Sequence, residues 1–187
     1  ITFTYPHIGN TGTNSDDHES DRVYAAGLII RDLPARLSSW RAELSLGEFL
    51  RRGHIVAIAD IDTRRLTRHL REKGSMSGCI MTGAVDPKTA IEHARRFPGL
   101  AGMDLARVVT VKEPYQWSLG PNWPASTLLP SKRAGAFQVV AYDFGIKRNI
   151  LRLLVDHDCR VVVVPAQTPA EDVLAVCEVF VENVEST

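Results

Sequence analysis

Cysteine is scarce in this sequence, and its few copies are poorly placed for cross-linking or metal binding. Cys79, Cys159 and Cys177 are odd in number, lie far apart and form no Cys-x-x-Cys pair. This spacing argues against a disulfide framework and a zinc ribbon, and it fits the reducing cytoplasm. We therefore expect a cytoplasmic protein without a metal site.

Net charge and long apolar runs are missing too. Lys plus Arg equals Asp plus Glu at 22 each, so no global field steers the chain to nucleic acid or anionic lipid. No apolar run reaches the roughly 18 to 20 residues of a membrane span, and no signal peptide is visible. Neither nucleic acid nor a membrane is an expected partner. The apolar share of 44% still allows the core of one large or two small domains.

The common active-site motifs are absent as well. The sequence has no Walker loop, Rossmann glycine fingerprint, His-Glu-x-x-His or paired zinc pattern. A nucleophile elbow needs its Ser or Cys between small residues, because its turn is sharp. Cys79 lies inside a strand pattern, Cys159 begins a strand and Cys177 follows a short helix. The residues alone therefore predict no catalytic residue.

One stretch, Asp16-Asp17-His18-Glu19, has the residue types of a metal site. Four consecutive loop residues cannot all face one ion, so we expect a solvated acidic loop instead.

Residues 1–111 predict a mixed α/β domain. Ile1 to Tyr5 has the pattern of the end of a strand, from which we expect the N-terminus to be incomplete. Further strands are predicted at 23–30, 55–59, 77–83 and 106–111, and the one at 55–59 is expected to be buried. Helices are predicted at 46–52 (capping box Ser45/Glu48), at 63–73 (N-cap Asp62, stop Gly74) and at 87–97 (Pro87 in the first turn).

The helix at 63–73 is unusually basic. It has Arg64, Arg65, Arg68, Arg71 and Lys73 around a narrow apolar stripe of two leucines. One interpretation is a solvated face, and the other is a docking face for an acidic partner surface.

Proline and tryptophan are concentrated in residues 112–135, which we interpret as a linker because proline at this density breaks helices and strands. A second domain, 136–187, then begins with a strand at 139–141, a helix from Ile146 and a strand at 160–164. This βαβ order predicts a parallel sheet, whose chemistry lies at the carboxyl ends of the strands, here at Asp143 to Gly145. A helix to about Ala175 and a third strand at 178–183 are expected to follow.

Several longer stretches are more specific than these patterns. They include Thr4-Tyr5-Pro6-His7-Ile8-Gly9-Asn10 and Ala141-Tyr142-Asp143-Phe144-Gly145-Ile146-Lys147-Arg148-Asn149-Ile150, together with residues 27–32, 56–64, 70–74, 97–100, 102–105 and 164–168. In these stretches, from Ile1 to about Leu174, the chain closely resembles the small, glutamine-hydrolysing subunit of carbamoyl-phosphate synthetase.

This resemblance implies an N-terminal domain followed by a class I glutamine amidotransferase domain with a Rossmann-like fold. In that family a Cys in a Gly-x-Cys-x-Gly elbow attacks the glutamine amide, and a His oriented by a Glu moves the proton. The ammonia passes to a large subunit, which uses ATP and Mg to make carbamoyl phosphate for arginine and pyrimidine biosynthesis. The small subunit itself is expected to need no cofactor.

The chain departs from the family at both ends. The elbow, the His and the Glu would lie beyond Thr187, and a glutamine-contacting Ser would lie before Ile1. Val184-Glu185-Ser186-Thr187 replaces the family's glycine loop, which supplies an oxyanion donor, so we expect a truncated, frame-altered or misassembled end.

Three expectations follow from these departures. The chain alone is inactive, and Asp143, Gly145 and Lys147 line at most the edge of the substrate site. The alternative function is a non-catalytic module that docks the large subunit, with Arg64, Arg65, Arg68 and Arg71 as its candidate surface.

Overall fold

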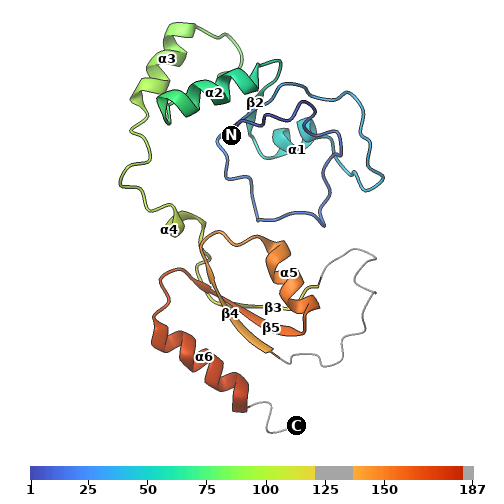
Figure 1. The fold of residues 1–187 in the computed structure, drawn as a ribbon, viewed down its shortest axis with the longest axis vertical. Coiled ribbons are helices and arrows are strands. Elements are labelled where there is room, and N and C mark those ends of the chain that lie inside the picture. The colour runs from blue at the N-terminus through green and yellow to red at the C-terminus, as the bar shows by residue number, and fades with distance from the viewer. Residues whose placement is uncertain (121–136, 183–187) are drawn as a thin grey trace. The chain divides into compact units, whose positions relative to one another are not determined.

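The computed structural model describes residues 1–120 and 137–182 (Figure 1). The chain forms two compact units, Ile1–Gly102 and Met103–Thr187, each described by itself below. Both contain helices and strands, which confirms the expected α/β class. The first unit ends at Gly102 and not at residue 111 as the sequence suggested, because residues 109–111 contact the sheet of the second unit.

The core of the first unit lies between a small parallel sheet and one helix. β1 (Gly27–Ile29) pairs with β2 (Val56–Ile58), with Leu28 opposite Ala57. α1 (Leu46–Arg52) places Leu50 against Leu28 and Ile30, and all three side chains are buried. On the other edge of β1, Thr2 forms a parallel bridge with Ile29, as the strand pattern of the first residues predicted.

The ends of α1 are fixed by the residues that the sequence singled out. The Ser45 hydroxyl accepts a hydrogen bond from the Glu48 N–H at 3.2 Å, and the Glu48 carboxylate accepts one from the Ser45 N–H at 3.0 Å. At the other end the Gly53 N–H donates to the Phe49 carbonyl at 3.1 Å. The predicted capping box is confirmed, and it sets the start of the helix that supplies Leu50 to the core.

Two further helices of this unit begin and end as predicted. α2 (Thr63–Lys73) starts at Asp62, whose carboxylate accepts a hydrogen bond from the Arg65 N–H at 3.0 Å. It ends at Gly74, which has a φ of 85°. α3 (Pro87–Arg96) has Pro87 in its first turn and the Asp86 carboxylate as its N-cap.

Two strand predictions in this unit need correction. Residues 77–83 form no strand: a Cβ added at Gly27 would lie 3.0 Å from Cδ1 of Ile80, but both edges of β1 are already taken by Thr2 and β2. β2 is formed but is not buried, since the Ile58 side chain is 41% exposed. Residues that favour β-structure thus predicted strands, but they did not show which strand edges of the sheet were free for pairing.

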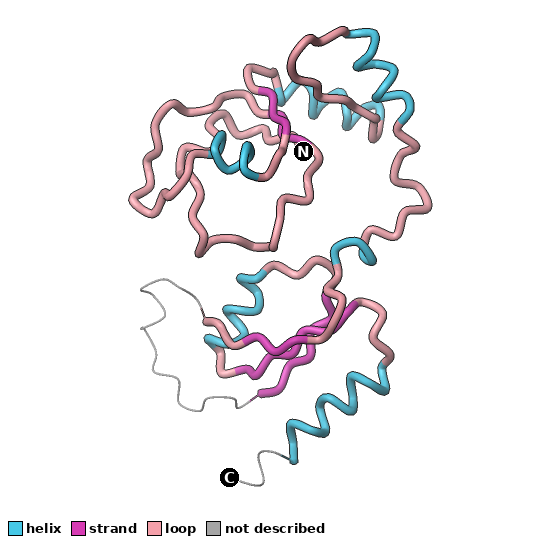
Figure 2. The backbone as a smooth tube through the Cα atoms, turned by 180° about the vertical axis from the view of Figure 1, so that it is seen from behind, coloured by secondary structure: helices cyan, strands magenta, loops and turns pink. Residues whose placement is uncertain are grey.

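The second unit contains a three-stranded sheet in the order β3-β5-β4. β4 (Phe137–Asp143) and β5 (Cys159–Pro165) are parallel, and β3 (Tyr115–Trp117) is antiparallel to β5. α5 (Arg148–Asp156) and α6 (Ala170–Glu182) lie on opposite sides of the sheet (Figures 1 and 2). β5 is therefore paired on both edges, and Val161, Val162, Val163 and Val164 are all buried.

Three predictions in this unit are wrong. Residues 106–109 form the short helix α4 (Ala106–Val109) and not a strand, because the Asp104 carboxylate accepts the Arg107 N–H at 3.2 Å and begins a helical turn. Residues 115–117 lie in β3 and not in a linker; most of the predicted linker falls outside the described residues. Residues 178–182 continue α6 instead of forming a third strand, since neither Gly nor Pro interrupts that segment.

The capping box predicts a particular response to acid. Hydrogen bonds from the side chain and then the backbone of Ser45, aided by the charges of Arg51 and Arg52, hold the pKa of the exposed Glu48 carboxyl below its ordinary value of 4.5. Because the pKa of Glu48 is lower in the folded than in the unfolded chain, its ionised carboxylate stabilises the fold. This stabilisation is complete above pH 4.5 and is lost as the pH falls through the pKa of the folded state. On a pH series of melting temperatures, wild type should therefore exceed Glu48→Gln near neutrality, and the difference should shrink in acid.

The control for this measurement is Glu92→Gln, which removes an exposed carboxylate of α3 that pairs only loosely with Arg96 at 3.9 Å. It should follow the wild-type pH profile. A constant difference between wild type and Glu48→Gln across the acid range would contradict the role assigned to the capping box.

Candidate functional site

The turn that follows β4 is organised by one buried carboxylate. The Asp143 side chain is 4% exposed, and its Oδ1 accepts hydrogen bonds from the N–H groups of Gly145 and Ile146, both at 2.9 Å. Its Oδ2 accepts a third from the Val111 N–H at 2.7 Å. Both carboxylate oxygens are thus used by the protein's own backbone, one to form the turn into α5 and the other to hold residue 111.

Residues 109–111 cross the carboxyl ends of β4 and β5. The Thr110 hydroxyl accepts the Ala166 N–H at 2.8 Å, just after β5. Gly145 has a φ of 92°, and a Cβ at that position would lie 3.2 Å from Cγ2 of Val109. Any larger residue at 145 would be both strained and crowded. The end of the sheet is therefore covered by a segment that lies more than thirty positions earlier in the chain.

Tyr115 of β3 shows that this region is electrostatically distinct. The pKa of its phenol is raised above the ordinary value of 10.0, mainly by burial and next by the negative charge of Asp143, with Arg148 acting in the opposite direction. Tyr115 also belongs to the apolar cluster around Leu151 and Val163. The Tyr115 phenol thus lies at the edge of the apolar core, where it is exposed to the charges of Asp143 and Arg148.

The three candidate residues in the turn after β4 differ in what they can offer to a ligand. Lys147 is exposed, and it precedes α5 without a side-chain cap. Phe144 is 63% exposed and stacks on Tyr142, whose hydroxyl donates to the Thr168 carbonyl at 3.1 Å. Of the three candidate residues at the site edge, only Lys147 therefore offers a polar side chain to a ligand. Their place beside a substrate stays a prediction.

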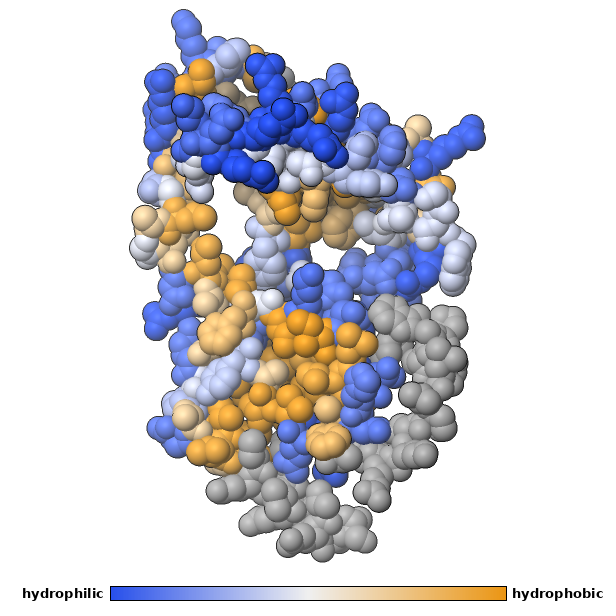
Figure 3. Space-filling model, viewed as in Figure 1, coloured by the Kyte–Doolittle hydropathy of each residue, from blue (hydrophilic) through white to orange (hydrophobic). Residues whose placement is uncertain are grey.

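The second candidate surface lies on α2. Arg64, Arg65, Arg68 and Arg71 are all exposed, whereas Thr63, on the inner side of the same helix, is 1% exposed. In the space-filling view, strongly hydrophilic side chains gather over α2 (Figure 3). None of these four arginines forms an ion pair with any carboxylate in the described part of the chain. The structure places all four on a charged, solvent-facing surface, and docking remains to be argued.

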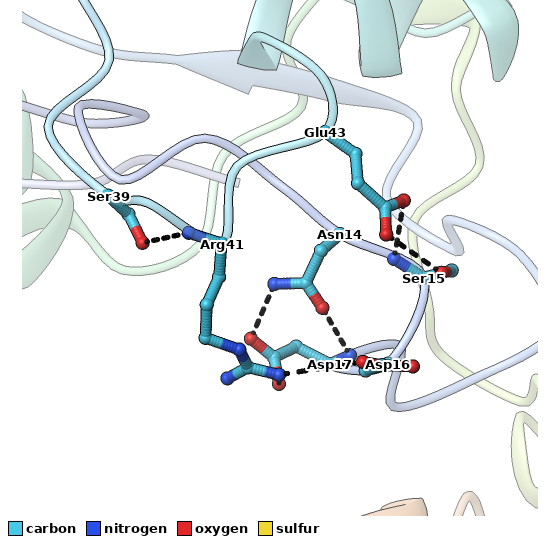
Figure 4. A network of polar contacts seen from close by, with 7 residues as sticks. All are labelled: Asn14, Ser15, Asp16, Asp17, Ser39, Arg41 and Glu43. Atoms are coloured by element: carbon cyan, nitrogen blue, oxygen red, sulfur yellow. Dashed lines mark hydrogen bonds and ion pairs between the residues drawn. The ribbon is translucent and has the colours of Figure 1, made fainter. Parts of the chain in front are cut away.

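The acidic loop serves to fasten two segments together (Figure 4). The Arg41 guanidinium lies 3.0 Å from the Asp17 carboxylate and 3.9 Å from that of Asp16. The Ser15 N–H and hydroxyl both donate to the Glu43 carboxylate, at 3.0 and 3.1 Å. No cluster that could hold a metal ion occurs among the residues that the structure describes, and here the acidic side chains join the loop to residues 41–43.

The described cysteines lack the setting of a nucleophile. Cys79 and Cys159 are free and partly buried, and the Cys159 thiol donates to the backbone carbonyl of His157 at 3.6 Å. The side chain of Cys177 lies outside the described part of the structure. Within residues 1–120 and 137–182, moreover, no helix combines the length and the apolar character that crossing a bilayer requires.

Sequence reasoning missed the contact between Asp143 and Val111. The pattern at 106–111 predicted a strand of the first domain, so nothing pointed to its role at the second sheet. Asp143 itself was found because it directly follows a strand. Its partner is separated from it by many residues, and no local signal in the sequence encodes that contact.

Asp143→Asn tests the role of the buried carboxylate. An amide cannot accept with both side-chain atoms, so at least one buried N–H should lose its partner, at a cost of about 1–3 kcal/mol. Urea unfolding should be followed through Trp117 fluorescence, with Trp40 and Trp123 replaced by Phe. The exposed Asp156→Asn is the matched control and should change stability by less than about 0.5 kcal/mol. Equal midpoints for the two variants would show that the Asp143 carboxylate contributes no special stability.

Comparison with known proteins identifies relatives along nearly the whole chain. Residues 1–80 match the family described as carbamoyl-phosphate synthase small chain, CPSase domain. The chain is 59% identical to a carbamoyl phosphate synthase small chain of Thioalkalivibrio sulfidiphilus, over 94% of this chain and 46% of that protein. The corresponding protein of Yersinia pseudotuberculosis is 60% identical over 93% of this chain and 45% of its own length. The chain thus spans about half the length of the curated relatives it matches, and it belongs to the carbamoyl-phosphate synthase small-chain family.

Proposed function

We propose that this chain is part of a glutamine-hydrolysing subunit that supplies ammonia for carbamoyl phosphate synthesis, in the pathways to arginine and pyrimidines. The observation that supports this most strongly is the identity of 59% to a carbamoyl phosphate synthase small chain over 94% of the chain. The order β4, α5, β5 agrees with the start of a parallel α/β domain of the amidotransferase kind.

In this proposal the chain does not hydrolyse glutamine by itself. A cysteine nucleophile needs a sharp turn between small residues and an adjacent base, and the sequence contains no Gly-x-Cys-x-Gly stretch. Cys159 directs its thiol to a backbone carbonyl. At the end of β4 the Asp143 carboxylate is already occupied by three N–H groups, so Asp143 and Gly145 shape the edge of the substrate site and Lys147 supplies its exposed charge.

The remaining parts of the proposal concern partners and surroundings. Glutamine is the substrate of the longer subunit, and a large subunit of the synthetase is the protein partner, which consumes the ammonia with ATP and Mg. The small subunit needs no cofactor of its own, and it works in the cytoplasm. The relatives' name, "small chain", supports the existence of a larger companion.

A second candidate function is that of a non-catalytic module, which docks the large subunit and has no part in hydrolysis. The observation in its favour is the set of exposed arginines on α2, since they need no active site to act. The two candidates make different predictions for a small chain in which these residues replace the aligned part. The first predicts that such a protein uses glutamine, and the second does not require it.

A chimera tests the proposal directly. The aligned residues of the Yersinia pseudotuberculosis small chain are replaced by those of this chain, and the product is combined with the large subunit of that organism. Because the replaced part is 60% identical, the chimera should sustain carbamoyl phosphate synthesis from glutamine. This chain alone, with the same large subunit, should support synthesis from added ammonia but none from glutamine.

The matched control for background glutaminase activity is the chain with Cys79, Cys159 and Cys177 all replaced by Ser. Ammonia release from glutamine should be the same for this variant and the wild-type chain. A folded chimera that uses ammonia but not glutamine would contradict the proposed function. Ammonia release by the chain that disappears in the cysteine variant would contradict its inactivity.

A further inference from the structure

We propose that Arg64, Arg68 and Arg71 form a docking stripe on α2 that binds a row of carboxylates on a partner protein. The choice of the synthetase large subunit as that partner rests on the proposed function. The stripe itself rests on the geometry and charge of α2.

The three arginines share one flank of the helix. An α-helix has 3.6 residues per turn, so spacings of four and three positions keep side chains on the same side. The inner side of α2 is formed by Thr63, which is buried, and by Leu66 and Leu70, which are half-buried. Arg65 lies farther round the helix. Glu72 is four positions after Arg68 and is therefore its surface neighbour, but the two form no ion pair. At about 1.5 Å per residue, the docking stripe extends about 10 Å along the axis.

Three arginines elsewhere in the described residues form ion pairs, whereas those of the docking stripe form none. Arg41 pairs with Asp17 at 3.0 Å, Arg96 with Glu92 at 3.9 Å and Arg107 with Asp104 at 3.4 Å. Arg64, Arg68 and Arg71 are exposed, and no carboxylate of the described residues forms an ion pair with them. Like charges at these spacings repel one another, so the free chain leaves an uncompensated row that an acidic surface would neutralise.

The helix is held firmly enough to present this row in a fixed geometry. The Asp62 carboxylate caps its first turn, the Thr67 hydroxyl donates to the Thr63 carbonyl at 2.7 Å, and the Gly74 N–H donates to the Leu70 carbonyl at 2.9 Å. A guanidinium presents a planar set of donors that matches the two oxygens of a carboxylate. A fixed row of such groups favours a partner with carboxylates at a matching spacing, such as an acidic helix.

The same features favour protein over nucleic acid. α2 contains no Phe, Tyr or Trp on which a base could stack, its one imidazole (His69) projects from a different side of the helix than the docking stripe, and the chain's formal charge is zero. Single-stranded nucleic acid is bound through extended basic grooves combined with such stacking. A short row on one helix flank fits a local carboxylate row better.

The test compares three triple variants in binding the purified large subunit of Yersinia pseudotuberculosis, by titration calorimetry at low and high salt. Arg64→Glu, Arg68→Glu and Arg71→Glu together should weaken binding by at least about tenfold and flatten its salt dependence. The charge-matched control reverses Lys88, Arg95 and Arg96, which are exposed on α3, and should weaken binding less than about twofold. Helical circular dichroism and melting temperature verify that each variant is folded.

The conservative variant replaces Arg64, Arg68 and Arg71 by Lys. It keeps the charge but loses the planar donor set, so it should bind more weakly than wild type and more tightly than the glutamate variant. A carbodiimide should then join these lysine amines to partner carboxylates through amide bonds, with the activated carbodiimide leaving as a urea. Mass spectrometry of the cross-linked peptides should show Asp or Glu at regular spacing. This result remains informative even if the glutamate variant fails to fold.

Several results would overturn the docking stripe. They are unchanged binding by the folded glutamate variant, equal weakening by the α3 control, cross-links that avoid positions 64, 68 and 71, and no binding of the wild-type chain at all. Stripe-dependent binding of an oligouridylate without binding of the large subunit would assign the row to nucleic acid and would also overturn the proposal. This test measures binding and not turnover. A chimera that fails to use glutamine would therefore contradict the proposed function without contradicting the docking stripe. Loss of binding in the glutamate variant, in turn, says nothing about whether the chimera uses glutamine.

Discussion

The second unit depends on the hydrogen bonds that the Asp143 carboxylate accepts from the backbone. Three N–H groups, those of Val111, Gly145 and Ile146, meet its two oxygens in a place that water hardly reaches. Without this acceptor, the start of α5 and the segment after α4 would each bury an unsatisfied donor. The turn also needs Gly145, because its φ of 92° strains any other residue and a Cβ there would lie only 3.2 Å from Cγ2 of Val109. One side chain thus joins the end of β4, the helix that follows it and a segment from much earlier in the chain.

The two candidate surfaces use charge in opposite ways. At the end of β4, the Asp143 carboxylate accepts its hydrogen bonds from the protein's own backbone. The turn therefore offers a ligand only its shape and the exposed side chain of Lys147. On α2, the arginines have no such internal partner among the described residues, and their charge is directed outward. The first arrangement suits a rigid site edge, and the second suits recognition of another surface. This contrast supports our two proposals, that the turn supports a substrate site and that α2 docks a partner protein.

The sequence predicted those features that depend on neighbouring residues. The capping box of Ser45, the N-cap Asp62 and the parallel pair β4 and β5 all follow from local spacing, and the structure contains them. The errors concern pairing at a distance. β3 pairs with β5 from within a proline-rich stretch, and this is possible because Pro114 lies just before the strand and removes no ladder donor. The candidate site residues were found by their position after a strand, but the internal use of Asp143 depends on Val111, which no local pattern links to it.

Residue-resolved hydrogen exchange of the Val111 amide in the unmodified chain tests the central claim most directly. If the Asp143 carboxylate accepts this N–H, the amide should exchange as slowly as that of Val163 in the central strand β5, although Val111 lies outside any helix or strand. The amides of Gly145 and Ile146 should be protected in the same way. Exchange of the Val111 amide as fast as that of Leu100, in an exposed loop, would contradict the account.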